Sequence, residues 1–291
     1  FRMAALLKEP VGETVGYRIR MESRVGPRTR IEVITEGVLT RMLQSDPGLP
    51  GVGIVIFDEF HERSLDADLG LALCREVQGH FNEHLKLLVM SATLDPAAVT
   101  TLLDNAPLIQ CQGRSFPVET RYAPPRQPDF IERAVMEIIL RSTAAEEGNL
   151  LVFLPGAPEI RRVARLLAEA GLPDRWDVAL LYGNLTRDQQ DAAIAPPPAG
   201  RGKIVLTTAI AETSLTIEQI GVVVDSGLRR APRFDPRAGM TRLVTLPVSR
   251  ASADQRRGRA GRLGPGICYR LWSEATHTTL AAHDRPEILD T

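Results

Sequence analysis

The sequence predicts an α/β protein with two domains, each built on a parallel sheet. Short apolar runs of strand length alternate with helical patterns along the chain, which is typical of βαβ units. The 291 residues are enough for about two domains with cores of their own. Residues 112–117 contain glycine and proline and show no periodicity, so we expect a break there. We place the first domain at 1–113, a linker at 114–117, and the second domain at 118–273.

In the first half, four apolar runs rich in branched residues read as buried strands. They lie near 31–35, 52–57, 85–90 and 107–111. Helical periodicity occupies the intervals near 36–44, 65–78 and 95–103. The order of these segments predicts one parallel sheet covered by helices.

The second half repeats the pattern. Strands are expected near 118–122, 149–154, 177–181, 203–207 and 221–225, with helices near 129–141, 157–170 and 186–194. Three prolines at 196–198 end the last helix, because proline lacks the backbone donor that a helix needs. Turn residues at 235–239 between extended segments predict an inserted β-hairpin. Residues 274–291 read as the start of a following region.

Composition indicates an ordinary globular protein, with 44% hydrophobic and 24% charged residues and a net charge of −1. No overall basic excess points to nucleic acid, but residues 229–262 contain ten arginines against two acids. The three cysteines form no CxxC pair, which favours reduced thiols in a cytoplasmic protein. No apolar run approaches the length of a membrane span, so we expect no membrane partner.

The junction after the apolar run 52–57 is the most informative point of the chain. It carries adjacent carboxylates, Asp58 and Glu59, where ligands of open α/β sheets bind. One carboxylate can hold Mg²⁺ on a nucleotide while the other positions or deprotonates a water. An isolated acidic pair is more often a solvated loop. Here Ser91 and Thr93 follow the next apolar strand, and their hydroxyls can bond His61 or the carboxylates.

A second signal is the arginine-rich run 255–262. Arg259 and Arg262 lie three residues apart on an expected helix and therefore share a face. A solvated basic helix is the plain alternative. The small residues between them favour close approach to another surface, and guanidinium groups suit phosphoryl charge because they are planar, always charged and bidentate.

Three further segments have two readings each. Thr35, Glu36 and Gly37 lie at a strand-to-helix junction, where the threonine can cap the helix while the amides grip a backbone phosphate. Thr208 and Thr213 belong to a hydroxyl-rich loop after a strand, which is either a polar connector or a phosphate contact. Arg2 is either a surface charge or a phosphate contact.

These residues together resemble the superfamily 2 DEAH-box helicases, most of all the bacterial HrpB-type ATP-dependent helicases. The acidic motif reads Asp58-Glu59-Phe60-His61, with phenylalanine where most members have alanine, a variant that is itself HrpB-like. The stretches 24–30 and 33–39 are also similar to that branch. The resemblance covers almost the whole chain.

The resemblance implies two RecA-like domains of the P-loop NTPase fold, with ATP in the cleft and nucleic acid across the top. Asp58 and Glu59 would serve Mg²⁺, Glu59 would activate water, Gln255 would contact the γ-phosphate, and Arg259 and Arg262 would act as arginine fingers. The implied couplers of hydrolysis to movement are His61, Ser91 and Thr93. The implied nucleic-acid contacts are Arg2, Thr35, Glu36, Gly37, Thr208 and Thr213. The family's strand-separating hairpin matches 233–246, including Arg233, Phe234, Asp235, Arg237 and Gly239.

Two departures from the family pattern stand out. Ala209 occupies a position that is usually asparagine, and no GxxxxGK[ST] phosphate loop occurs in the 291 residues. We therefore expect an N-terminally truncated chain with an incomplete first sheet and little ATPase of its own. We also expect the family's C-terminal domains to be absent, with 274–291 only beginning a winged-helix-type region.

The leading hypothesis is an ATP- and Mg²⁺-dependent helicase or translocase acting on single-stranded or duplex RNA or DNA, as a monomer. A non-catalytic nucleic-acid-binding module or scaffold is the main alternative, and a double-stranded-DNA translocase of another superfamily 2 branch is a third. Backbone contacts carry little base information, so the sequence leaves RNA and DNA open.

Overall fold

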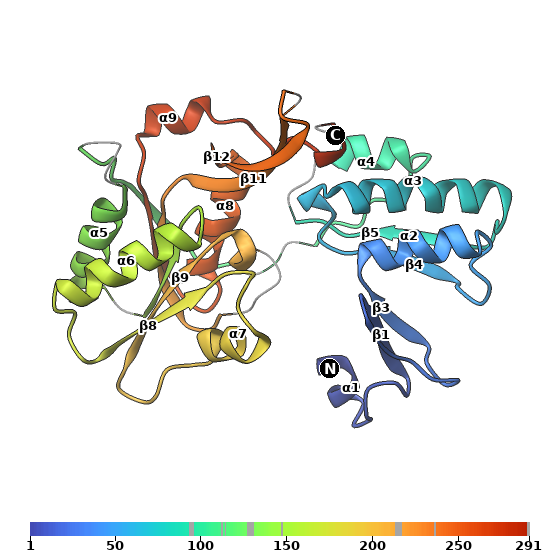
Figure 1. Ribbon diagram of the computed structural model, residues 1–291, viewed down its shortest axis with the longest axis horizontal. Coiled ribbons are helices and arrows are strands. Elements are labelled where there is room, and N and C mark those ends of the chain that lie inside the picture. The colour runs from blue at the N-terminus through green and yellow to red at the C-terminus, as the bar shows by residue number, and fades with distance from the viewer. Residues whose placement is uncertain are drawn as a thin grey trace. The chain divides into compact units, whose positions relative to one another are not determined.

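The computed structural model describes residues 1–92, 96–111, 113, 115–126, 131–146, 148–212, 217–235 and 237–289 (Figure 1). The chain divides into two compact units, which we treat separately. Unit 1 comprises residues 1–106 with the C-terminal segment from Arg285, and unit 2 comprises residues 107–284.

Unit 2 is built on a six-stranded sheet in which every pairing is parallel. The strands, in spatial order, are β6 (Val118–Tyr122), β13 (Gly266–Arg270), β10 (Ile220–Asp225), β7 (Asn149–Phe153), β9 (Gly202–Thr207) and β8 (Trp176–Leu181). Because all strands run the same way, the loops that follow them emerge along one edge of the sheet.

Helices cover both faces of this sheet (Figure 1). On one face, α5 (Ile131–Ala145) and α6 (Ala157–Glu169) pack on Leu150 and Val152 of β7. On the other, α7 (Arg187–Ile194) joins the cluster that contains Leu151 and Phe153. Successive residues of one strand thus enter different cores, which is why a strand buried on both faces reads as a continuous apolar run.

Several of the remaining elements of unit 2 follow the carboxyl ends of strands. A 3-10 turn, η3 (Ala209–Ala211), follows β9, and a hairpin of β11 (Leu228–Asp235) and β12 (Met240–Pro247) follows β10. Next come α8 (Arg250–Gly258), the 3-10 turn η4 (Arg259–Gly261) and, after β13, α9 (Glu274–Thr279). The predicted hairpin is confirmed, and its strands begin earlier than the sequence indicated.

Unit 1 holds two small sheets instead of the single sheet expected. One contains β1 (Val15–Ile19), β2 (Glu22–Arg24) and β3 (Ile31–Ile34), and the other pairs β4 (Ile54–Phe57) with β5 (Lys86–Val89) in parallel. Its helical segments are α1 (Arg2–Leu6), α2 (Glu36–Ser45), η1 (Phe60–Glu62), α3 (Leu65–His80), α4 (Pro96–Leu102) and η5 (Glu287–Leu289).

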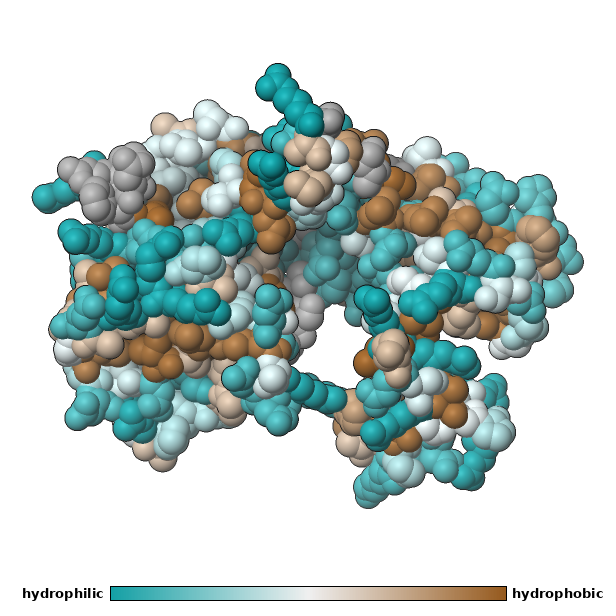
Figure 2. Space-filling model, viewed as in Figure 1, coloured by the Kyte–Doolittle hydropathy of each residue, from teal (hydrophilic) through white to brown (hydrophobic). Residues whose placement is uncertain are grey.

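The core of unit 1 forms where α2 and α3 cover one face of the β4–β5 pair. Leu39 and Leu43 of α2 meet Phe57, Leu71 and other buried residues there. Ser64 caps α3 by accepting a hydrogen bond from the Ala67 amide at 3.1 Å. Apolar side chains also remain at the surface of this unit, among hydrophilic ones (Figure 2).

One strand prediction is wrong and several elements were missed. Residues 107–111 form no strand: Leu108 and Ile109 are 57% and 85% exposed, and no described strand pairs with them. The missed strands are β1, β2 and β13. β1 is a five-residue run that contains a glycine and an arginine, β2 has three polar, exposed residues, and β13 is a five-residue run that ends in arginine. Such runs lack the apolar period that identifies a strand.

The three cysteines carry free thiols. Burial raises the pKa of the Cys74 thiol to about 11 and that of Cys268 to about 12, so both stay protonated near neutral pH. In the part of the chain that the structure describes, no helix is long and apolar enough to cross a membrane.

Candidate functional site

The acidic turn after β4 is held in an uncommon backbone conformation. Asp58 is exposed, and Glu59 has φ 50° and ψ 35°, in the left-handed region. A non-glycine residue there costs about 1–3 kcal/mol, and such residues cluster where the surrounding structure fixes a functional group. Arg63 closes η1 with a second positive φ of 50°.

Phe60 pins this turn to the neighbouring strand. Its amide donates to the Met90 carbonyl at 3.0 Å, and the Met90 amide donates to the Phe57 carbonyl at 2.8 Å. The Phe60 ring is 2% exposed and meets the Phe57 ring edge-on at 6.1 Å. Backbone hydrogen bonds thus tie the turn after β4 to the end of β5. The burial of the ring against Phe57 accounts for a large aromatic residue at position 60.

His61 brings these two strand ends into side-chain contact. Its Nδ1 lies 3.4 Å from Glu59 Oε2 and 3.5 Å from the Ala92 amide nitrogen. The His61 side chain is 6% exposed, whereas Ser91 is exposed. Glu59, His61 and the backbone at Ala92 thus lie together, and the contact to His61 comes from an amide, whereas the sequence predicted a hydroxyl there. Thr93 lies outside the described residues.

The acidic turn suits Mg²⁺ better than an all-protein metal site. Asp58 Oδ1 accepts the Glu59 amide at 2.9 Å, and the carboxylate faces solvent. Among the described residues, no group of three His, Cys, Asp or Glu side chains could hold a metal. Mg²⁺ is normally bound through one or two carboxylates, with waters and substrate phosphates completing its shell, and the donor set fits that pattern.

The start of α2 corrects one expectation. Thr35 is the N-cap residue, but its side chain accepts no capping hydrogen bond. The Val38 amide, which a capping hydroxyl would satisfy, donates instead to the Thr35 carbonyl at 2.9 Å. Gly37 follows in the first turn, and Glu36 Oε2 accepts the Ser64 hydroxyl at 2.8 Å. Burial raises the pKa of Glu36, against the lowering effect of that hydrogen bond.

Two of the predicted nucleic-acid-binding residues are at least partly accessible to solvent. Arg2 lies in the short helix α1 with an exposed side chain. Thr208 precedes η3 and is half-buried, and its amide donates to the Leu181 carbonyl at 3.3 Å. Thr213 lies outside the described residues.

The arginine-rich run does not continue as one helix. The helix α8 ends at Gly258 and η4 tightens the chain over 259–261, so the expected helix through Arg262 is wrong. Gly261 permits close packing at this turn, because a Cβ there would lie 2.7 Å from the Phe116 carbonyl oxygen. The close approach predicted from the small residues is therefore to the chain just before β6.

This turn nevertheless brings the two predicted arginines together. Arg259, 6% exposed, and Arg262, exposed, both line a pocket of about 270 Å³. Its other walls include Ile217, Glu218 and Gln219, just before β10. Gln255 lies one turn earlier on α8, partly buried.

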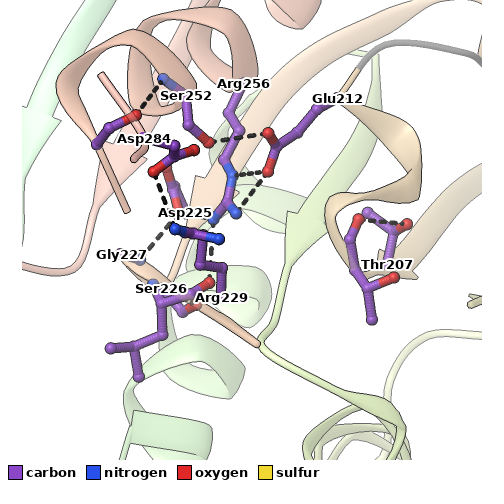
Figure 3. Close-up of polar contacts among 12 residues, drawn as sticks. Thr207, Glu212, Asp225, Ser226, Gly227, Arg229, Ser252, Arg256 and Asp284 are labelled. Carbon is purple, nitrogen blue, oxygen red and sulfur yellow. Dashed lines mark hydrogen bonds and ion pairs between the residues drawn. The ribbon is translucent and has the colours of Figure 1, made fainter. Parts of the chain in front are cut away.

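The sequence analysis missed Arg256, the largest fully buried side chain of the described part. Its guanidinium contacts Asp225 at 2.8 Å and Glu212 at 2.6 Å (Figure 3). It also lies 4.9 Å from the centre of the Phe153 ring. Burial lowers the pKa of Arg256, but the two carboxylates outweigh it and raise the pKa above its ordinary value. The available signal was Asp225, an acid at the end of an otherwise apolar strand.

The hairpin carries its predicted residues at or near the tip. Asp235 Oδ1 accepts the amides of Arg237 at 3.0 Å and Ala238 at 3.4 Å. Gly239 has φ +61°, which favours glycine. Arg233 is exposed and Phe234 is 47% exposed, so the tip presents charged and aromatic groups to solvent.

Comparisons with known proteins agree with this arrangement. Residues 131–264 match the model of the helicase conserved C-terminal domain. The chain is 53% identical over 290 residues to the ATP-dependent RNA helicase HrpB of Escherichia coli (strain K12), covering 99% of this chain and 36% of that protein. It is 39% identical over 289 residues to the probable ATP-dependent RNA helicase DHX34 of Mus musculus, covering 95% of this chain and 25% of that protein.

Solved structures give the same result. A crystal structure of the E. coli DExH-box NTPase HrpB matches with a TM-score of 0.89, and one of the Escherichia coli DEAH/RHA helicase HrpB with 0.92. Both are 52% identical to this chain and cover all of it, while the chain covers 36% and 37% of them. The chain thus spans about a third of the length of these relatives.

Proposed function

The chain belongs to the superfamily 2 DEAH-box helicases, in the branch that includes HrpB, and we propose that its parent protein is an ATP-dependent RNA helicase. The observation that carries this proposal is the acidic turn: Glu59 is held in a left-handed conformation, with His61 3.4 Å from its carboxylate. An acid fixed at a strand end in this way suits the activation of a water molecule.

We assign the chemistry of hydrolysis to both units. Glu59 accepts a proton from the attacking water, and the contact with His61 orients its carboxylate. Asp58 would hold Mg²⁺, which would supply neutralisation of the phosphate charge. Arg259 and Arg262, which share a pocket wall, stabilise the charge that develops on the γ-phosphate, and Gln255 contacts the same phosphate.

We assign RNA as the substrate because both curated relatives are named RNA helicases. Arg2, Thr35, Glu36, Gly37, Thr208 and Thr213 would contact its sugar-phosphate backbone, since amides and hydroxyls at loop and helix ends suit phosphate oxygens. The hairpin tip, with Phe234 exposed, would separate strands. The protein would act as a monomer.

The 291-residue chain alone should hydrolyse little ATP. It contains no GxxxxGK[ST] segment, whose amides and lysine hold the β- and γ-phosphates in P-loop enzymes. Its remaining activity would be weak binding of single strands that falls steeply with salt, because phosphate neutralisation releases counterions. For the chain by itself, this describes a nucleic-acid-binding module.

The test is ATP hydrolysis by the full-length protein with Mg²⁺, measured alone, with single-stranded RNA and with DNA of the same sequence. We expect turnover of about 1 s⁻¹ or more, a typical enzymatic rate, and stimulation by RNA. A folded full-length protein without ATPase would contradict the enzymatic proposal. Equal stimulation by DNA would contradict the choice of RNA.

A further inference from the structure

We infer that Arg256 is a positioning residue, which ties the loop after β9 to the arginine turn so that RNA bound at that loop raises the rate of ATP hydrolysis. This inference rests on the proposed function, because it assumes that the loop contacts RNA and that Arg259 and Arg262 serve ATP. All the groups that carry it lie within unit 2.

Arg256 joins three segments that are distant in sequence. From α8, its Nη1 donates to Asp225 Oδ1 at 2.8 Å, at the end of β10. Its Nε donates to Glu212 Oε1 at 2.7 Å, and its Nη2 lies 2.6 Å from the same oxygen, just after η3. Nη1 also reaches the Leu228 carbonyl at 3.3 Å, where β11 begins. One guanidinium on α8 therefore contacts the end of β10, the start of β11 and the residue that follows η3.

A second link runs from the same helix to the same carboxylate. Ser252, one turn before Arg256, donates its hydroxyl to Glu212 Oε2 at 2.8 Å (Figure 3). Side chains four residues apart lie on one face of a helix, so α8 grips both oxygens of Glu212. The loop cannot shift along the helix without breaking one of these contacts.

Burial makes these contacts difficult to break. The side chains of Arg256, Asp225 and Glu212 are 1%, 0% and 13% exposed. Removing one partner of a buried ion pair strands the other charge in a poorly hydrated place. Asp225 Oδ2 already has no hydrogen-bond partner among the described residues. Loss of the bond from Arg256 would therefore leave more of this carboxylate unpaired.

The network lies close in sequence to the residues proposed to contact RNA and to the arginines proposed to contact ATP. Glu212 lies four residues after Thr208 and directly before Thr213. Arg256 lies three residues before Arg259, whose amide donates to the Arg256 carbonyl. Displacement of the loop by RNA would therefore reach the arginine turn through a short, packed path, which is the physical requirement for coupling between two sites.

The decisive experiment compares full-length wild type with Glu212→Gln and Ser252→Ala. For each protein we would measure ATP turnover without RNA and at saturating RNA, the KM for ATP, and RNA binding by fluorescence anisotropy. Glu212→Gln should lower the stimulation by RNA about tenfold, within the usual range of coupling between sites. Ser252→Ala should lower it less. Neither should change RNA affinity or the KM for ATP as much as it changes stimulation.

Lys203→Met supplies the matched control for general destabilisation. Lys203 is a buried cation at the other end of β9, where its ammonium donates to the Ala192 and Ala193 carbonyls at 3.1 and 3.3 Å. Its loss should lower the melting temperature and leave stimulation intact. If Glu212→Gln does not fold, Ser252→Ala decides.

Three outcomes would overturn the inference. Unchanged stimulation in the folded Glu212 or Ser252 variants would show that the network is only structural. An equal loss of stimulation in Lys203→Met would show the same. A wild-type protein with ATPase but no response to RNA would refute the coupling, whereas one without ATPase would refute the proposed function itself.

Discussion

Apolar strands of similar sequence are buried to different extents in the two units. In unit 2, Val222, Val223 and Val224 of β10 are at most 1% exposed, whereas in unit 1 Ile54 and Ile56 of β4 are 48% and 52% exposed. β10 has strands on both sides and cores on both faces, while β4 pairs with β5 alone. An apolar run therefore predicts a strand, but the layers around the strand decide how much of it is buried.

The candidate sites of the two units also differ in how deeply the groups that hold them are buried. In unit 1, the acidic turn keeps Glu59 in a strained backbone conformation and is held by the Phe60 hydrogen bond and one histidine. In unit 2, a buried ion network holds the loops at the sheet edge. We propose that unit 2 contributes the arginines and that unit 1 carries the groups that would activate water and hold Mg²⁺.

The largest expected effect concerns unit 2. In the full-length protein, Arg259→Ala or Arg262→Ala should reduce the ATP turnover number about 10³–10⁵-fold, the usual range for an arginine finger. RNA affinity should change little. Arg165→Ala, at an exposed position on α6, is the control and should leave turnover unchanged. Loss of RNA binding with intact ATPase would make the arginine turn a strand-binding surface instead.

The matching change in unit 1 is Glu59→Gln. Turnover should fall about 10²–10⁴-fold, since the water loses its proton acceptor, while Asp58 keeps ATP and Mg²⁺ bound. Equilibrium binding of labelled ATP separates the two effects. Glu76→Gln, exposed on α3, should behave as wild type. A Glu59→Gln enzyme with near-normal turnover would remove Glu59 from the chemistry.

Truncations of the strands test the comparison of burial directly. Leu151→Ala in β7, where the side chain is 1% exposed, should reduce the free energy of unfolding of unit 2 by about 2–5 kcal/mol. Ile56→Ala in β4 is a change at a half-exposed position and should have an effect of about 0.5 kcal/mol on unit 1. Denaturant melts followed by hydrogen exchange resolve the two units. Similar losses in both would show that the open face of β4 is covered in solution.

The smallest effect on hydrolysis is expected from the hairpin. Replacing residues 235–239 by two glycines should abolish unwinding and retain RNA-stimulated ATPase, because the described tip residues are largely exposed and no core is opened. Unwinding of a labelled duplex and ATPase would be measured on one preparation. Unwinding that persists, or equal loss of both activities, would argue against a strand-separating role.

Sequence reasoning found what depends on local pattern. The strands β7, β9 and β10 are continuous apolar runs, and the acids that follow β4 are adjacent in the chain, so both were predictable. It did not find β1 and β2, which are short and are held in strand conformation by the pairing of β1 with β2 and with β3. Pairing of this kind leaves no periodic trace in a single sequence.

The role of Arg256 also depends on partners that are distant in the sequence, so it could not be predicted from local pattern. Its partners Glu212 and Asp225 lie 44 and 31 residues away in sequence, so the sequence did not distinguish it from the neighbouring arginines that were expected to meet a phosphate. Only the fold shows that this charge is buried and paired. The sequence also predicted a capping role for Thr35, which the carbonyl of the same residue takes over by accepting the Val38 amide.

The central claim is that the acidic turn of unit 1 serves ATP hydrolysis. The direct test is cross-linking with an ATP analogue that carries a photoreactive group on its γ-phosphate, bound to the full-length Glu59→Gln protein, with excess unlabelled ATP as the competition control. Mass spectrometry should find competable adducts in peptides containing residues 58–62. Competable adducts that occur elsewhere in the protein but not in this segment would contradict the claim.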